Sequence, residues 1–163
     1  GVEYFKGPAS FHFADKAVKV PGLDGTGKMG KSEGNCLYLC DDEKTVTKKI
    51  MRAVTDQGPT QLNQEKPEVI QNLFTLCELL CGKEAADYYN DLYNNMQIRY
   101  GDMKKQMAAD ANALLAPIRE RILAYSSDDA LLDRIMRQGA EKAAARAEKT
   151  IEEVREIIGF RKI

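Results

Sequence analysis

Beyond residue 40, the apolar residues of this chain recur every three to four positions, which is the spacing of one face of an α-helix. Asp41 and Asp42 are suited to cap a first helix, and Gly58-Pro59 is suited to stop it. Pro67 suits the first position of a second helix, and Gly82 suits a left-handed cap at its end. The pattern predicts five helices, which begin near Asp41, Pro67, Ala85, Asp102 and Ser127, the last running to Gly159.

Each predicted helix has an apolar stripe that must be covered by a neighbouring element. Pro117 interrupts the fourth helix and should bend it near Ala113, because its ring removes one backbone donor and clashes with the preceding turn. The expected inward positions are Val46, Ile50 and Val54; Val69, Ile70, Leu73, Phe74, Cys77, Leu80 and Cys81; Tyr89, Leu92, Tyr93 and Met96; Met103, Met107, Leu114, Leu115, Ile118 and Ile122; and Leu131, Leu132, Ile135, Met136, Ile151, Val154 and Ile158.

The first 40 residues differ from the rest because they combine glycine, proline and aromatic residues without helical spacing. The run Ala17-Val18-Lys19-Val20 is β-like and is closed by Pro21-Gly22. No alternation of strands and helices follows, so a parallel sheet is not expected. The predicted fold class is mainly α: a helical bundle of about five helices after a short irregular or β segment.

Composition sets few limits on function. The chain has 163 residues, 44% of them apolar, which is enough for one core, and 24 basic residues against 25 acidic ones give a net charge of −1. No apolar run is long enough to cross a membrane, and no leader pattern opens the chain, so a cytoplasmic protein is expected. The four cysteines form two C-x-x-x-C pairs rather than the C-x-x-C pairs typical of zinc, so no metal site is predicted. The weaker alternative is a metal site at Cys77 and Cys81, whose four-residue spacing on a helix can present two thiolates on one face.

The stretch GTGKMGKSEGN, residues 25–35, contains the candidate chemistry. Its first eight residues match the phosphate-binding pattern G-x-x-x-x-G-K-[ST], which would indicate a P-loop nucleotide-binding protein. A P-loop requires a helix that begins at its Lys-Ser end, whereas Glu33-Gly34-Asn35 and an extended-looking segment follow Ser32. The P-loop therefore remains the weaker alternative, and a solvated surface turn rich in glycine and lysine is the plainest one.

Lys28 and Lys31 can act on a phosphate without that helix. When a carboxylate attacks the α-phosphate of ATP, negative charge grows on the departing pyrophosphate, and two ammonium groups directed at it stabilise the transition state. Ser32 can add a hydroxyl donor, Mg²⁺ would share the charge, and the surrounding glycines leave the loop free to close over a ligand.

The run KMGKS, residues 28–32, is similar to the KMSKS loop of class I aminoacyl-tRNA synthetases. Further segments then match in order: CDDEKTVTKKIMRAVTD, YGDMKKQMAAD, LAPIRERI and GAEKAAARAEKTIEEVREIIGF. Together they resemble the part of bacterial-type tryptophanyl-tRNA synthetases that runs from just before this loop to the C-terminus, over nearly all of residues 20–163.

The resemblance implies ATP-dependent activation of tryptophan and its transfer to tRNA(Trp) by a homodimer, with ATP and Mg²⁺ as cofactors. Residues 1–40 would be the end of the Rossmann-like catalytic domain, and residues 41–163 the helical domain that binds tRNA and its anticodon. The ATP-binding residues would be Val20, Lys28, Met29, Gly30, Lys31 and Ser32, with Lys28, Lys31 and Ser32 also catalytic.

Two departures from the family pattern affect the expected activity. Gly30 stands where the loop usually has serine, which removes one hydroxyl group. The His-x-Gly-His signature is missing, because His12 is the one histidine. We therefore expect a C-terminal portion of a synthetase that does not catalyse by itself.

A non-catalytic helical module that binds RNA or a partner protein is the alternative from another functional class. Basic clusters could position a tRNA backbone, and exposed tyrosines could stack on unpaired bases, although acidic neighbours interleave with most of the basic groups. The candidates by type are Lys48, Lys49 and Arg52; Arg99, Lys104 and Lys105; Arg119, Arg121, Arg134 and Arg137; and Tyr88, Tyr89, Tyr93 and Tyr100.

Overall fold

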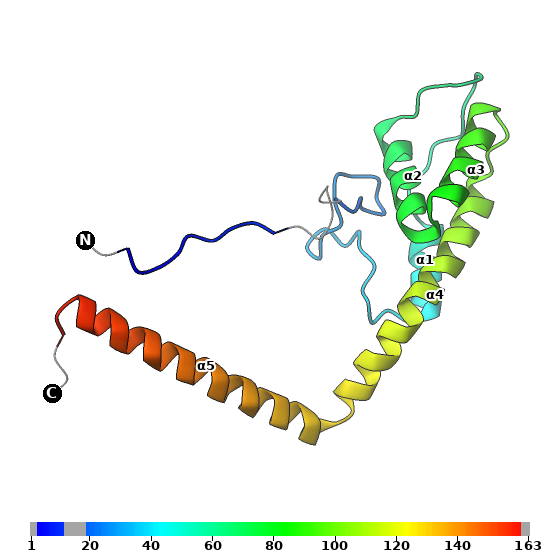
Figure 1. Cartoon of the computed structure of the whole chain (residues 1–163). Helices are drawn as coiled ribbons and strands as arrows, with labels where there is room; N and C mark the ends of the chain where they lie inside the picture. Colours follow the sequence, from blue (N-terminus) through cyan, green and yellow to red (C-terminus); the bar gives the residue numbers. More distant parts are fainter. Residues whose placement is uncertain (1–2, 12–18, 161–163) are drawn as a thin grey trace. The chain divides into compact units, whose positions relative to one another are not determined.

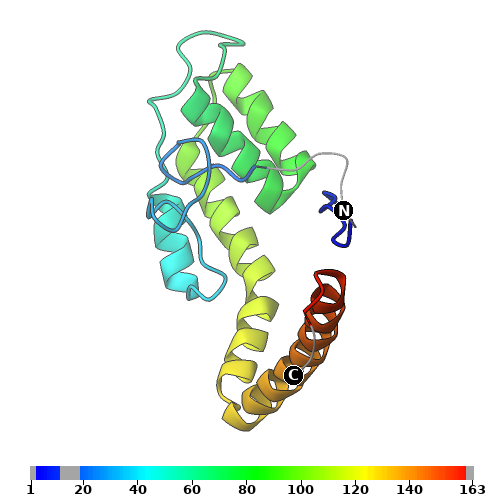
Figure 2. The same cartoon turned by 90° about the vertical axis from the view of Figure 1, so that its left-hand side faces the viewer.

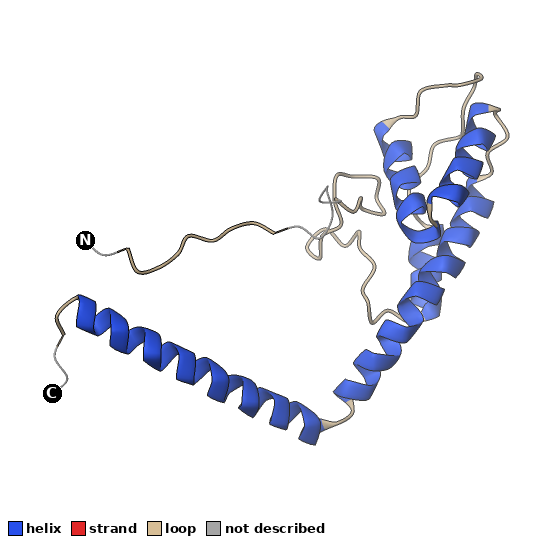
Figure 3. Ribbon diagram, in the orientation of Figure 1, coloured by secondary structure: helices blue, strands red, loops and turns tan. Residues whose placement is uncertain are grey.

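The structure, a computed structural model, describes residues 3–11 and 19–160. Within these residues it contains five α-helices and no β-strand (Figure 3). The prediction of a mainly helical chain with five helices is confirmed. Lys19 and Val20 do not form the expected strand, while Ala17, Val18 and His12 lie outside the described residues. The helices are α1 (Glu43–Met51), α2 (Glu68–Cys81), α3 (Lys83–Asn94), α4 (Tyr100–Ser126) and α5 (Asp129–Ile157).

Helix α1 begins where its polar residues can satisfy the free N–H groups of its first turn. The Asp42 carboxylate accepts a hydrogen bond from the N–H of Thr45 at 2.6 Å, and this bond holds the Asp42 pKa below its usual range. Glu43 in the first turn and Lys48 and Lys49 in the last complement the helix dipole. The helix ends at Met51, earlier than Gly58-Pro59, so Val54 lies beyond it and is exposed.

Helices α2 and α3 lie side by side and are separated by one residue (Figure 1). Gly82 has φ 85° and ψ 169°, which is outside the left-handed helical region that was predicted for it. This conformation turns the chain at once, so α3 begins at Lys83 rather than at Ala85. Pro67 lies one position before α2, in the capping position, rather than inside the helix.

The chain divides into two compact units, and the larger, Val18–Ile122, contains the hydrophobic core. Its core is built from α1, α2, α3 and the first turns of α4. Figure 2 shows α1 beside α4, and the Asn112 amide on α4 donates to the Glu43 carbonyl and the Thr47 hydroxyl on α1. The side chains buried most completely are Val46, Ile50, Ile70, Cys77, Tyr93, Met103 and Met107.

Helix α4 continues through Pro117, because the ring removes only one backbone donor from a long helix. The inward stripe that was predicted for this helix is correct at Met103, Met107 and Leu115, whereas Leu114 and Ile118 are exposed.

The other unit comprises Gly1–Ala17 and Leu123–Ile163. In it, Asp128 caps α5 by accepting a hydrogen bond from the N–H of Leu131 at 2.8 Å, and the Tyr4 hydroxyl donates to the Glu153 carboxylate on α5. The apolar positions of α5 are not buried as predicted, since none of its residues is fully buried and Ile135 and Met136 are exposed.

Candidate phosphate-binding loop

The segment from Val20 to Asn35 folds back on itself without a helix or strand. The N–H of Met29 donates to the Val20 carbonyl at 2.8 Å, and the N–H of Leu23 donates to the Asn35 carbonyl at 2.9 Å. These two bonds bring the beginning and end of the segment together. The run from Lys28 to Ser32 therefore starts from a backbone that is fixed at its base.

The side chain of Asn35 holds the interior of this loop. It is only 4% exposed, and its amide nitrogen donates to the Asp24 carboxylate at 3.0 Å and to the Lys28 carbonyl at 3.2 Å. Its amide oxygen accepts the N–H of Gly30 at 2.9 Å. A buried amide that is satisfied on both sides in this way fixes the backbone around it. Asn35 thus sets the path of the backbone on either side of Met29.

Asp24 completes the hydrogen-bond cluster from the other side of the loop. Its carboxylate accepts the N–H of Thr26 at 3.1 Å and the Thr26 hydroxyl at 2.8 Å. These bonds and the one from Asn35 favour the ionised form, so the Asp24 pKa lies below its usual value, with the Thr26 N–H as the largest cause. Gly22 must lack a side chain here, because a Cβ would lie 2.2 Å from the Asn35 amide nitrogen.

The base of the loop is attached to the helical core. The N–H of Val54, just after α1, donates to the Leu23 carbonyl at 3.0 Å, and the Asn72 amide on α2 donates to the Gly25 carbonyl at 2.9 Å. Leu23 itself belongs to the hydrophobic core. The loop therefore sits on α1 and α2 through both backbone and side-chain contacts.

Three of the predicted site residues, Lys28, Lys31 and Ser32, present their side chains to solvent. Within residues 3–11 and 19–160, neither lysine ammonium group makes an ion pair or a hydrogen bond. The Ser32 hydroxyl donates to the neighbouring Glu33 carboxylate at 3.3 Å. Two positive charges are thus available to an anionic ligand.

The other three predicted residues have structural contacts. Met29, between the two lysines, is half-buried and packs against the hydrophobic core. Gly30 donates its N–H to Asn35, and Val20 accepts the N–H of Met29 while its own side chain is exposed. Sequence gives only a weak signal for Asn35, because asparagine after a glycine is typical of any turn. The sequence analysis did not include Lys19 among the loop residues. In the structure its ammonium group lies beside the loop, 3.4 Å from the position that a Cβ of Gly27 would take.

The P-loop alternative is wrong. Residues 31–34 form turns, in which the N–H of Glu33 bonds to Gly30 and that of Gly34 to Lys31, and the next helix begins only at Glu43. A P-loop directs the free N–H groups of a helix at the phosphates, and here no helix stands between Lys31 and Leu39.

Several basic residues that were candidates for tRNA contacts are used inside the protein. Lys49 forms an ion pair with Asp41 at 2.6 Å and lies over the Tyr38 ring. Lys104 is buried and donates to the Ala53 carbonyl, and Arg119 donates to the Asp41 carbonyl at 2.7 Å. One member of each of the three basic clusters therefore stabilises the fold.

Among the described residues, no group of three or more His, Cys, Asp or Glu side chains is placed so that it could hold a metal ion. Cys36 and Cys77 are buried, Cys81 is half-buried and Cys40 is exposed. None of the described helices is apolar over a length that would cross a membrane.

Comparison with known proteins gives a consistent result. The family model of class I tRNA synthetases (W and Y) matches residues 4–116. A tryptophan–tRNA ligase of Porphyromonas gingivalis is 56% identical over 160 residues, and one of Streptococcus pyogenes is 39% identical over 151 residues. These alignments cover 98% and 90% of this chain but 49% and 44% of the relatives, so the chain spans about half their length.

Solved structures agree with the sequence comparison. The tryptophanyl-tRNA synthetase of Campylobacter jejuni, in a complex with ADP and tryptophan, superposes with a TM-score of 0.72 and 26% identity over 90% of this chain and 45% of that one. Another structure of the C. jejuni enzyme gives a TM-score of 0.67 at 28% identity, over 88% of this chain and 44% of the other. With the family model covering more than two thirds of its residues, this chain belongs to the class I tRNA synthetases of the W and Y group.

Proposed function

We propose that this chain supplies the phosphate-binding loop and the helical tRNA-binding part of a tryptophan–tRNA ligase. Such an enzyme uses ATP to convert tryptophan to its adenylate and then transfers the amino acid to tRNA(Trp). The names of the two relatives described above support tryptophan as the amino acid. The free ammonium groups of Lys28 and Lys31, on a loop that Asn35 and the core hold in place, are the observation that carries the proposal.

The loop can favour adenylate formation through electrostatics. As the tryptophan carboxylate attacks the α-phosphate, charge develops on the leaving pyrophosphate, and a pair of cations carried by this loop stabilises that charge more than it stabilises bound ATP. In this proposal Lys28 and Lys31 contact the pyrophosphate and the Ser32 hydroxyl donates to it. Gly30 and Met29 form the loop backbone against the nucleotide, and Val20 lies at the adenine.

Mg²⁺ fits this proposal as a companion of the nucleotide rather than as a metal held by this chain. The described residues bring together no cluster of acidic ligands that would hold it. Mg²⁺ is commonly bound mainly by substrate phosphates and water, with few protein ligands. When bound, it would supply additional charge neutralisation on the phosphates.

A ligand titration tests the loop directly. We expect ATP or pyrophosphate to shift the amide NMR signals of residues 27–33 in this chain, and Lys31→Ala to reduce that response. Lys83→Ala is the matched control, because Lys83 is also exposed but lies on α3. No shift at millimolar ligand would instead favour the alternative of a non-catalytic helical module that binds RNA or a partner protein.

The complete ligase allows a second test, of the role assigned to Lys31. Lys31→Ala should slow adenylate formation much more than it weakens tryptophan binding, because the contact is made in the transition state. Equal losses in both quantities would contradict that role.

The remaining features of the proposal follow from the resemblance to the family. The helical domain of residues 41–163 binds tRNA(Trp), residues 1–40 complete the catalytic domain, and the ligase works as a homodimer in the cytoplasm. Filter binding of labelled tRNA and sedimentation of the complete ligase test the partner and the oligomeric state.

A further inference from the structure

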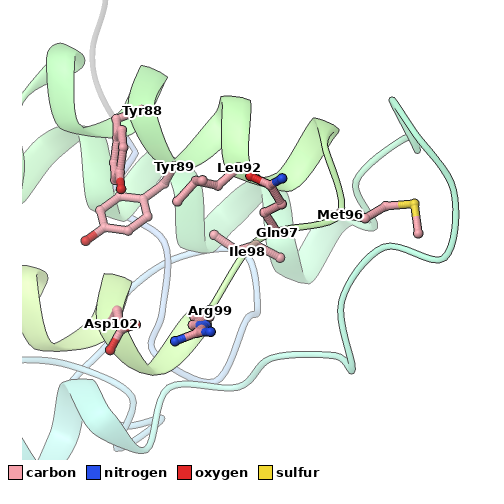
Figure 4. Close-up of a pocket in the computed structure, with 8 residues that line it drawn as sticks. All are labelled: Tyr88, Tyr89, Leu92, Met96, Gln97, Ile98, Arg99 and Asp102. Atoms are coloured by element: carbon pink, nitrogen blue, oxygen red, sulfur yellow. The ribbon is translucent and has the colours of Figure 1, made fainter.

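A surface pocket lies at the end of α3, where the chain turns toward α4 (Figure 4). Its volume of about 630 Å³ is within the range of small-ligand sites. Tyr88, Tyr89 and Leu92 line it from α3, and Arg99 and Asp102 line it from the opposite side. This pocket lies in the unit Val18–Ile122 and shares no residue with the phosphate-binding loop.

The turn that shapes the pocket is fixed by its backbone. Met96 has φ 58°, its N–H bonds to the Tyr93 carbonyl at 3.0 Å, and the N–H of Gln97 bonds to the Leu92 carbonyl at 2.7 Å. This pair of bonds is the Schellman type of helix end, here with methionine in place of the usual glycine. The Arg99 carbonyl then accepts the N–H groups of Asp102 and Met103 in the first turn of α4. The pocket is thus preformed.

Two adjacent tyrosines give the pocket an aromatic wall. Tyr89 is 8% exposed and belongs to the hydrophobic core, whereas Tyr88 is 60% exposed. Their ring centroids lie 5.2 Å apart with the planes at 68°. The buried ring therefore supports the exposed one, and Tyr88 can offer a ring face to a flat aromatic ligand.

The polar groups of the pocket complement an anionic ligand that has a hydrogen-bonding edge. Neither the Arg99 guanidinium nor the Gln97 side-chain amide forms an ion pair or hydrogen bond with other described residues. Asp102, the acidic group of the lining, is already paired with Lys105 at 3.5 Å. A free guanidinium suits a phosphate, and a free amide both donates and accepts.

We propose that this pocket binds one unpaired RNA base, stacked on Tyr88, with its edge at Gln97 and its phosphate at Arg99. Unpaired bases are recognised by stacking on aromatic side chains and by hydrogen bonds to their edges. The inference rests on the proposed function, in which tRNA is the partner, and it assigns that partner a specific contact on α3.

Binding of a tRNA(Trp) transcript to the complete ligase tests the contact. Stacking contributes about 1–3 kcal/mol per base, so Tyr88→Ala should weaken binding about 5- to 150-fold, whereas Tyr88→Phe keeps the ring and should stay within about twofold. Tyr125→Ala is the matched control, because Tyr125 is 53% exposed and does not line the pocket. Arg99→Gln should lower the salt dependence of binding by about one phosphate contact.

The other outcomes overturn the proposal. If Tyr88→Ala binds tRNA as tightly as the unchanged ligase, the pocket holds no base, while the proposed function stands. If Tyr88→Ala weakens a fully paired RNA duplex as much as it weakens tRNA, Tyr88 contacts the backbone rather than a base. Failure of the proposed function itself is distinguishable, because the loop titration uses ATP and pyrophosphate and does not involve Tyr88.

Discussion

The ammonium group of Lys104 donates a hydrogen bond to the backbone carbonyl of Ala53, 2.6 Å away, although Lys104 is only 7% exposed. The Thr55 hydroxyl lies 3.4 Å from the same nitrogen, and burial lowers the Lys104 pKa. Val54, the residue after Ala53, donates in turn to Leu23 at the base of the phosphate-binding loop. A single lysine therefore connects α4 to the segment that supports the loop.

Replacing this lysine should destabilise the fold. In Lys104→Met the apolar stem is kept but the Ala53 carbonyl loses its partner, and an unsatisfied buried acceptor costs about 1–3 kcal/mol. Urea unfolding measures the difference. Lys105→Met is the matched control, because Lys105 is exposed and its ion pair with Asp102 should contribute less than about 1 kcal/mol. Equal stabilities of the two variants would show that the buried contact contributes nothing.

Removing the side chain of Asn35 should loosen the loop. Asn35→Ala deletes the acceptor for the Gly30 N–H and the donor to the Lys28 carbonyl, so the Gly30 amide should lose its protection from hydrogen exchange. Asn35→Asp keeps the acceptor but places a second carboxylate beside Asp24, and its effect should be relieved by Asp24→Asn. Unchanged exchange at Gly30 in Asn35→Ala would contradict the anchoring role.

Two glycines of the loop should respond differently to the same substitution. Gly25 has φ 80°, and a Cβ there would lie 2.6 Å from the Val69 side chain, so Gly25→Ala should destabilise the protein by about 1–3 kcal/mol. Gly27 meets nothing closer than the flexible end of Lys19 at 3.4 Å, so Gly27→Ala should change stability by less than about 0.5 kcal/mol. Thermal unfolding of both variants tests the contrast, which similar melting temperatures would refute.

Acid should weaken the turn at Asp24. Because the Asp24 pKa is lower in the folded protein, its stabilising effect is complete above the unfolded value of about 3.9 and is lost as the pH falls through the folded value. The amide signal of Thr26 should therefore titrate with a midpoint below about 3.9. Asp24→Asn keeps an acceptor oxygen and should abolish this titration. A midpoint at or above the usual Asp value would show that the hydrogen bond from Thr26 does not lower the Asp24 pKa.

The spacing of apolar residues was sufficient to predict the helices, but not their exact ends. Val46 and Ile50 are buried as expected, while Val54 continues the same four-residue spacing and is exposed, because α1 stops at Met51. Periodicity records which residues share a face, and it does not record where backbone hydrogen bonding ends. Helix α5 illustrates a further limit of prediction from sequence, since its apolar stripe was predicted to be buried and none of its residues is. An apolar stripe indicates a face suited to burial, but not which element covers it.

The candidate site was predictable only in its exposed half. Lys28, Lys31 and Ser32 stand out by type and spacing, whereas Asn35 acts through Asp24 and Gly30, whose proximity exists only in the folded loop. Lys104 is a similar case, because in the sequence it is one of several surface-type lysines and only its position against Ala53 makes it structural.

Met29 packs on the core between the two lysines, and its own N–H is bonded to Val20. This attachment restrains the backbone of the loop from closing as a lid. The side chains of Lys28 and Lys31 would therefore have to move to reach an incoming triphosphate. Rotamer changes of exposed side chains take picoseconds to nanoseconds, against microseconds or longer for lid closure. Binding of the phosphates would then require rotation of the two lysine side chains rather than a new path of the main chain.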